Sequence, residues 1–200
     1  MKVVVIKYNA GNIRSVLFAL ERIGVNAVVT DDHDEIRSAD RVIFPGVGEA
    51  SSAMKYLKEK GLDTLISSLT QPVLGICLGM QLMCKHSEEN NTECLGIFDQ
   101  TVRLFPQEGL KIPQIGWNNI TNLKTDLFGG VNENAYMYFV HSYYVEKCDN
   151  AIALTDYVSE YSSAVQKDNF YAVQFHPEKS GEAGQKILEN FIFNLVIRTK

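Results

Sequence analysis

Strand-like and helical patterns alternate through the first half of the chain. Short apolar and β-branched runs predict buried strands at 3–6, 26–30, 41–44 and 73–76. Apolar residues at helical spacing predict helices at 16–23, 50–60 and 78–86. This order of elements predicts a parallel sheet with right-handed crossovers and helices on both faces.

The middle of the chain has a different pattern, rich in aromatic and turn residues and without helical periodicity. Its strand candidates are 116–120, 136–145, 151–155, 163–166 and 171–175. The last pattern, 183–197, predicts an amphipathic helix that closes the sheet. We therefore predict an α/β fold in a single domain, residues 1–200. Its mostly parallel central sheet is flanked by helices and carries an added antiparallel or mixed strand region.

Composition excludes several classes of protein. Hydrophobic residues make up 46% of the chain and charged residues 22%, which is typical of a globular protein and excludes disorder. The net charge of -5 disfavours a general nucleic-acid-binding surface. No apolar run approaches the roughly 20 residues that span a membrane, and the N-terminal apolar run is too short for a signal peptide. We therefore expect a cytoplasmic protein.

The spacing of the cysteines favours reduced, reactive thiols over structural cross-links. None of Cys77, Cys84, Cys94 and Cys148 forms a Cys-x-x-Cys pair, and no pair of histidines lies nearby. A structural zinc site is therefore not expected, and reduced thiols are the natural interpretation. We predict neither a metal nor a cofactor, and one thiol becomes a candidate nucleophile.

Cys77 stands in the sequence Gly75-Ile76-Cys77-Leu78-Gly79, where an apolar strand passes directly into a predicted helix. This is the arrangement of a nucleophile elbow, in which glycines on either side permit a sharp turn. The start of the helix favours a thiolate, and the Leu78 N–H would face a developing oxyanion. The alternative is a buried, inert cysteine in a glycine-rich packing turn.

His176 and Glu178 follow another apolar strand, and Pro177 between them ends the ladder. In extended backbone the two side chains share a face, roughly 6–7 Å apart along the chain. A carboxylate beside an imidazole fixes its tautomer and supports the imidazolium. Alone, the pair is more typical of a surface contact. Because parallel sheets place sites at the carboxyl edge of their strands, its combination with Cys77 favours an active site.

Other candidates are weaker when each is considered alone. The Gly46-Val47-Gly48 segment after Pro45 offers a second oxyanion donor or a plain turn. Gln81 lies one helical turn after Cys77 and is expected to face the same cleft. His141 is more typical of a hydrogen-bonded structural histidine.

Taken together, the motifs at 45–48, 75–81 and 176–180 resemble those of the class I, or triad, glutamine amidotransferases. The segments 116–118, 139–143 and 164–171 are most similar to the glutaminase subunits of histidine biosynthesis. The resemblance covers essentially the whole chain and implies a flavodoxin-like amidotransferase fold.

The resemblance implies roles for individual residues. Cys77 would attack the side-chain amide of glutamine, His176 would move protons and Glu178 would orient His176. The implied oxyanion and substrate-binding residues are Gly46, Val47, Gly48, Leu78, Gln81, Ser142 and Tyr143. The implied partner-interface and gating residues are Asn12, Trp117 and Lys179. Ammonia would pass to a (βα)8-barrel cyclase in a heterodimer, and the Val47–Gly48 strand is hypothesised to shift when that partner binds its substrate.

Three other interpretations stay open at the level of sequence. The chain is alternatively an amidotransferase subunit of another pathway, such as anthranilate, aminodeoxychorismate or surface-sugar synthesis. It is alternatively a stand-alone cysteine hydrolase that needs no partner. The last alternative is a non-catalytic regulatory subunit, against which the intact Cys77, His176 and Glu178 argue.

Overall fold

The computed structural model describes residues 1–9, 13–107 and 109–195. Its strands are β1 (Val3–Ile6), β2 (Val28–Thr30), β3 (Arg41–Gly46), β4 (Val73–Cys77), β5 (Cys84–Ser87), β6 (Thr92–Glu93), β7 (Phe98–Leu104), β8 (Gln114–Asn119), β9 (Tyr136–His141), β10 (Tyr143–Glu146), β11 (Ala151–Asp156), β12 (Glu160–Lys167) and β13 (Phe170–Val173). Its helices are α1 (Ile13–Arg22), α2 (His33–Arg37), α3 (Ala50–Glu59), α4 (Leu62–Ser67), α5 (Leu78–Met83) and α6 (Gly181–Glu189). Short helical turns are η1 (Glu89–Asn91), η2 (Asp126–Phe128), η3 (Pro177–Lys179) and η4 (Asn190–Asn194).

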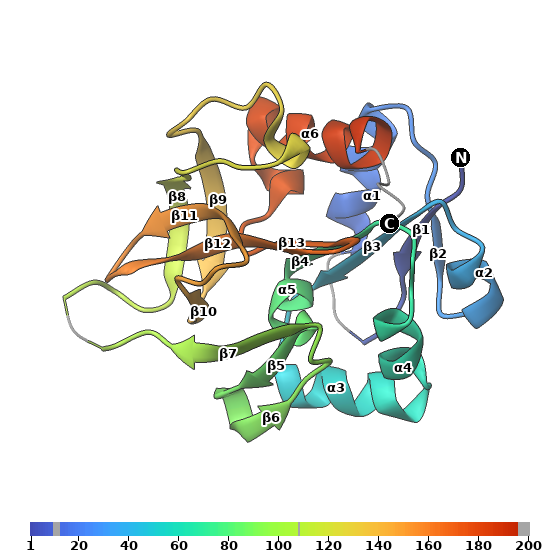
Figure 1. Cartoon of the computed structure of the whole chain (residues 1–200), viewed down its shortest axis with the longest axis horizontal. Helices are drawn as coiled ribbons and strands as arrows, with labels where there is room; N and C mark the ends of the chain where they lie inside the picture. Colours follow the sequence, from blue (N-terminus) through green and yellow to red (C-terminus); the bar gives the residue numbers. More distant parts are fainter. Residues whose placement is uncertain (10–12, 108, 196–200) are drawn as a thin grey trace.

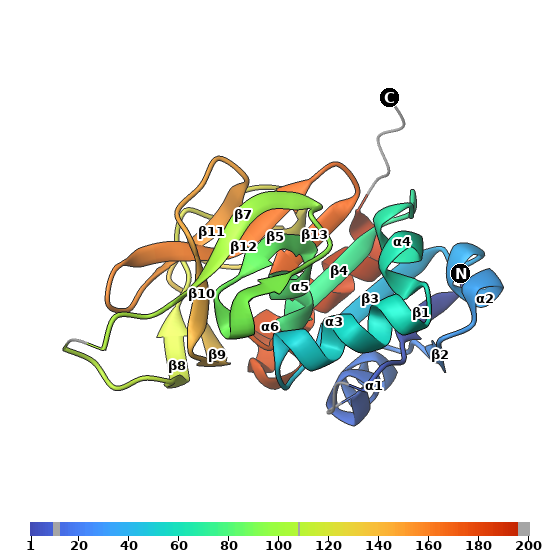
Figure 2. The ribbon, with the colours of Figure 1, turned by 90° about the horizontal axis from the view of Figure 1, so that it is seen from below.

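The central sheet runs in the order β2-β1-β3-β4-β13-β12-β10-β7-β5-β6, and β11 pairs with β12. From β2 to β13 every pairing is parallel, and from β13 to β7 every pairing is antiparallel. Strands β8 and β9 form a separate antiparallel pair. Figures 1 and 2 place this pair at the opposite end of the molecule from β2 and α2. The predicted fold class is therefore confirmed.

Helices cover both faces of the parallel strands. Figure 1 shows α1 and α6 above the sheet and α3, α4 and α5 below it, and Figure 2 shows α3 lying across β1, β3 and β4. Alternation along β1 divides its side chains between two cores. Val4 and Ile6 pack with α3, α4 and α5, whereas Val3 and Val5 pack with α1 and α6. Strands buried on both faces explain the continuous apolar runs of the sequence.

Several predicted boundaries are wrong. The helix expected at 78–86 ends at Met83, because Cys84 turns to an extended conformation and residues 84–87 pair with β7 as β5. β3 continues beyond 44 through Pro45 and Gly46, which register with Ile76 and Cys77 of β4. The strand expected at 136–145 is divided into β9 and β10, which belong to different sheets.

Other elements were not predicted or end early. The patterns missed the short helices α2 and α4 and the strand β7, each of which depends on packing against distant segments. The final helix begins at Gly181, ends at Glu189 and continues as the π-helical turn η4. No helix within the described ranges is both long and apolar enough to cross a bilayer.

Candidate active site

Cys77 lies at a strained turn between β4 and α5, with φ 53° and ψ -110°. Such a backbone conformation costs a non-glycine residue on the order of 1–3 kcal/mol, so close packing must hold it. A Cβ at Gly79 would collide with the Phe44 carbonyl, and one at Gly75 would lie 2.9 Å from the Met83 sulfur. These glycines let α5 lie directly on the sheet, which fixes the turn. The elbow expected from the sequence is present.

His176 lies on the extension of β13, next to β4 at the carboxyl edge of the sheet. Its backbone N–H donates to the Tyr138 carbonyl of β9 at 2.9 Å. Its own carbonyl accepts a hydrogen bond from the Ser180 hydroxyl at 2.6 Å, and the same hydroxyl accepts from the Tyr138 N–H at 2.9 Å. The backbone of His176 is therefore held on both sides by β9 and Ser180.

Glu178 contacts the imidazole of His176 directly, with 2.8 Å between Nδ1 and Oε1. The extended geometry expected for this pair is wrong. Residues 177–179 form the 3₁₀ turn η3, and the turn brings the carboxylate back to the ring. Proline suits this first helical position because it needs no hydrogen-bonded N–H there. The other carboxylate oxygen, Oε2, is buried without a hydrogen-bond partner among the described residues.

The electrostatics of His176 follow from these contacts. Burial alone would lower the pKa of His176, but its hydrogen bonds to Cys77 and Glu178, and their negative charges, outweigh burial and raise the pKa to about 10. The raised pKa favours the protonated imidazole, which has an N–H for each neighbour. Cys77, His176 and Glu178 thus form one contiguous arrangement.

Besides His176, the polar surroundings of the sulfur include the Val140 carbonyl, 3.8 Å from Cys77 Sγ, and two buried amides. Gln174 donates from Nε2 to Cys77 Sγ at 3.6 Å, and its Oε1 accepts from Gln81 Nε2 at 3.0 Å. Gln81 Nε2 also donates to the Tyr143 carbonyl at 3.1 Å. Gln174 was not among the residues expected at the site. Its polar side chain two residues before His176, among apolar neighbours, is the sequence signal that could have identified it.

Gly46, Gly48 and Leu78 were also expected near Cys77. Gly46 pairs with Cys77, and a Cβ there would collide with the Tyr8 hydroxyl. That hydroxyl donates to the Pro45 carbonyl at 2.6 Å and so anchors the start of the Gly46–Val47–Gly48 segment. Gly48 has φ 118°, which favours glycine. Leu78 is the first residue of α5, so its N–H has no partner within its helix.

His141 and Tyr143 lie at the junction of β9 and β10, on either side of the half-buried Ser142. The Tyr143 carbonyl accepts a hydrogen bond from His141 Nδ1 at 2.7 Å as well as from Gln81. Burial lowers the pKa of His141 to about 4; the bond to Tyr143 opposes the shift and the charge of His176 adds to it. His141 is thus a neutral, hydrogen-bonded structural histidine, as predicted.

Trp117 and Lys179 both contact the ring of Tyr138 in β9. The Lys179 ammonium lies 5.8 Å from the ring centroid of Tyr138, and the Trp117 ring packs edge-on against Tyr138 at 5.9 Å. Asn12 lies outside the described residues.

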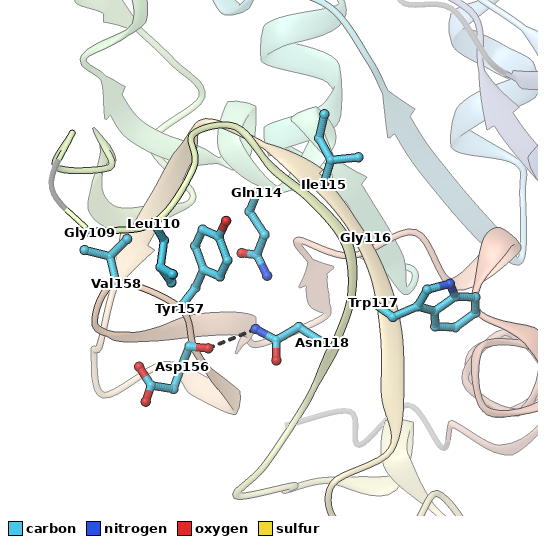
Figure 3. Close-up of a pocket in the computed structure, with 10 residues that line it drawn as sticks. All are labelled: Gly109, Leu110, Gln114, Ile115, Gly116, Trp117, Asn118, Asp156, Tyr157 and Val158. Atoms are coloured by element: carbon cyan, nitrogen blue, oxygen red, sulfur yellow. Dashed lines mark hydrogen bonds between the residues drawn. The ribbon is translucent and has the colours of Figure 1, made fainter.

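A cavity of about 510 Å³ lies elsewhere, between β8 and the turn after β11. In Figure 3 its wall includes Gln114, Tyr157 and the Asn118–Asp156 contact, while Trp117 points away from the other side chains. No residue of the triad lines it. In the part of the chain that the structure describes, no group of three or more His, Cys, Asp or Glu residues could hold a metal ion.

Comparisons with known proteins agree with this geometry. The family model for glutamine amidotransferase class-I matches residues 4–195. Imidazole glycerol phosphate synthase subunit HisH of Bacteroides fragilis (strain ATCC 25285) is 60% identical over 194 residues, which cover 96% of this chain and 99% of that protein. The HisH subunit of Haemophilus influenzae is 45% identical over 193 residues, with coverage of 96% and 97%.

Two solved structures share the fold at low sequence identity. PurLQS from Thermotoga maritima has a TM-score of 0.71 at 18% identity and covers 96% of this chain and 97% of its own. A glutamine amidotransferase has a TM-score of 0.73 at 17% identity, with coverage of 94% and 98%.

The chain therefore belongs to the class I glutamine amidotransferases. The fold and the cysteine elbow beside a His–Glu pair agree with that class. Within it, identities of 45–60% over nearly the whole chain make it a member of the family of imidazole glycerol phosphate synthase HisH subunits. The resemblance inferred from the sequence is confirmed.

Proposed function

We propose that this chain is the glutaminase subunit of imidazole glycerol phosphate synthase. In this proposal it hydrolyses glutamine and delivers the ammonia to a (βα)8-barrel cyclase, which makes imidazole glycerol phosphate and aminoimidazole carboxamide ribotide. The observation that carries the proposal is the contiguous contact of Cys77, His176 and Glu178 in a chain 60% identical to a HisH subunit. We further propose that residues 1–200 form one amidotransferase domain that works in the cytoplasm.

The first half of the reaction releases ammonia. The Cys77 thiolate attacks the amide carbon of glutamine, and the charge that develops on the amide oxygen is stabilised by the N–H groups of Leu78 and the Gly46–Val47–Gly48 segment. As the tetrahedral intermediate collapses, the C–N bond breaks and His176 gives its proton to the departing nitrogen. The products are ammonia and a γ-glutamyl thioester on Cys77.

The second half restores the enzyme. His176, now neutral, takes a proton from water as the water oxygen attacks the thioester carbonyl. The C–S bond then breaks, glutamate leaves and Cys77 returns to the thiolate beside a protonated His176. Glu178 holds the imidazole orientation through both steps. Gln81, Ser142 and Tyr143 are proposed to hold the substrate.

An apolar face supports the proposed contact with the cyclase. Ile115, Trp117 and Tyr136 are each more than half exposed on the outer side of β8 and β9. Exposed aromatic side chains of this kind are enriched at protein interfaces. The same β9 backbone holds His176, so a partner on this face would lie one strand from the catalytic base. Docking there is proposed to shift the Val47–Gly48 segment, and equal glutaminase turnover with and without the partner and its ligand would refute that shift.

Substitution of the nucleophile tests the function. Cys77→Ala should abolish glutamine hydrolysis by the complex while leaving ammonia-dependent synthesis by the cyclase intact. Cys148→Ala is a matched control, because Cys148 is a free, half-buried cysteine whose sulfur contacts Ser162. Persistent glutamine hydrolysis in Cys77→Ala would show that another residue is the nucleophile. Glutamine hydrolysis without any gain in cyclase product would favour a stand-alone hydrolase.

A further inference from the structure

The Gln174 amide lies against the reacting sulfur and is itself fully buried. Its nitrogen is 3.6 Å from Cys77 Sγ, and the side chain has no exposed surface. Gln81, its partner, is 5% exposed. A buried amide is costly unless its donors and acceptors are paired, so the direction of each hydrogen bond in this group is constrained.

A backbone carbonyl fixes that direction. The Tyr143 oxygen can only accept, and it lies 3.1 Å from the Gln81 amide, so Gln81 must present its NH₂ group there. The second N–H of that NH₂ group donates to Gln174 Oε1 at 3.0 Å. Gln174 must then direct its own NH₂ group toward Cys77. The orientation of both amides, which side-chain shape alone leaves open, thus follows from hydrogen-bond chemistry.

Gln174 directly follows β13, at the carboxyl edge of the sheet where Cys77 also lies. Gln174 and His176 are two residues apart, and the Gln174 N–H continues the ladder by donating to the Ser163 carbonyl at 2.8 Å. The backbone bends at residues 174–175 after β13, and the hydrogen bonds of Gln174 and His176 show that both side chains reach Cys77. The sulfur therefore receives one N–H from an amide and one from the imidazole.

We propose that Gln174 is a further catalytic residue, whose amide N–H donates to the Cys77 sulfur and stabilises its thiolate form. Gln81 is a positioning residue that holds the Gln174 amide in the donating orientation. A hydrogen bond to the charged form of a group favours that form, and it is stronger than one to the neutral form. This inference rests on the proposed function, in which Cys77 is the nucleophile.

The pH dependence of Cys77 alkylation tests the inference without using glutamine. Iodoacetamide modification of the full chain is followed from pH 4 to pH 10 by mass spectrometry of the Cys77 peptide. Gln174→Met keeps the approximate side-chain volume but has no N–H donor, so the pH of half-maximal reactivity should rise by about one unit. Gln71→Met is a matched control far from Cys77. It removes one side-chain hydrogen bond, in which Gln71 Nε2 donates to the Ile36 carbonyl at 2.8 Å. Its profile should equal that of the parent.

A second variant separates the two amides. Gln81→Met leaves Gln174 in place but no longer fixes the orientation of its amide. The pH of half-maximal Cys77 alkylation should therefore rise by less than in Gln174→Met. The double variant should match Gln174→Met alone, because the effect of Gln81 on the Cys77 thiolate passes through Gln174. Additive shifts would overturn the positioning role of Gln81.

An unshifted midpoint in folded Gln174→Met would overturn the proposal. Folding is checked by the thermal transition, and if Gln174→Met does not fold, an unshifted Gln81→Met overturns the proposal in its place. Failure of the proposed function is distinguished by the Cys77→Ala assay. Loss of glutaminase in Cys77→Ala together with an unshifted Gln174→Met profile refutes only the role of Gln174.

Discussion

The two parts of the candidate site are held in place by different forces. Around Cys77, the parallel strands and α5 approach so closely that glycine is required at Gly46, Gly75 and Gly79. Around His176 and Glu178, the antiparallel strand β9, Ser180 and the turn η3 hold the backbone through short hydrogen bonds. Cys77 is positioned mainly by steric packing, whereas His176 and Glu178 are positioned mainly by polar contacts.

This difference predicts how each part of the site should respond to substitutions and to pH. Packing that admits only glycine leaves no room for an added methyl group, but it carries no charge and should be insensitive to pH. Polar positioning tolerates changes of volume better, but it depends on protonation and on each buried hydrogen bond.

The largest effect is expected at Gly79. Gly79→Ala places a methyl group against the Phe44 carbonyl, so α5 must move away from β3 or the protein must unfold. We expect a loss of at least about 3 kcal/mol in the free energy of unfolding, measured by urea denaturation, and no measurable glutaminase activity.

Gly24→Ala is the control for this substitution. Gly24 has φ 79° and open space around its Cβ position, so only backbone strain of about 1 kcal/mol is expected, with activity retained. Equal losses in the two variants would mean that steric packing does not position the nucleophile.

In the part of the site held by polar contacts, His141 should make the free energy of unfolding depend on pH. The pKa of this buried histidine is lowered to about 4, whereas it is about 6.5 in the unfolded chain. Between these values the unfolded state binds more protons, so stability falls as pH falls, by about 1.4 kcal/mol per unit and about 3 kcal/mol in all. Urea unfolding at several pH values between 7 and 4 measures this slope.

His141→Gln should flatten that slope, because an amide has nothing to protonate, although it also lowers stability at neutral pH. His33→Gln, at a half-buried histidine bonded to the Lys60 carbonyl, serves as the matched control and should keep the slope of the parent. The same slope in His141→Gln as in the parent would remove His141 as the source of acid sensitivity.

The smallest effects are expected from removing a single buried hydroxyl, either near Cys77 or near His176. Tyr8→Phe removes one bond, to the Pro45 carbonyl, and should cost about 1 kcal/mol of stability with little change in glutaminase rate. Ser180→Ala removes two bonds, to the His176 carbonyl and from the Tyr138 N–H, and should cost about 2 kcal/mol. It should also lower the glutaminase rate about tenfold, since His176 loses its support. A larger loss of activity in Tyr8→Phe than in Ser180→Ala would reverse the comparison.

The parallel strands were more predictable from sequence than the short helices between them and the strand β5. Continuous apolar runs such as 73–76 define buried strands, and Gly75 and Gly79 mark a close approach before any partner is known. The short helices α2 and α4, and the strand β5 in place of the end of a helix, carry no comparable signal. Their conformations depend on pairing and packing with segments distant in sequence, which local periodicity does not report.

By itself the sequence determined the alternating architecture, the sharp turn at Cys77 and the residue types of a Cys–His–Glu arrangement, because each is encoded in local pattern and spacing. Three features depend on the folded chain: η3 brings Glu178 back onto His176, β9 and Ser180 hold the His176 backbone, and Gln81 and Gln174 link Tyr143 to the sulfur. The physical reason is that these bonds join residues as much as 97 positions apart. Hydrogen-bond direction at such separations is set by which backbone groups the fold brings together.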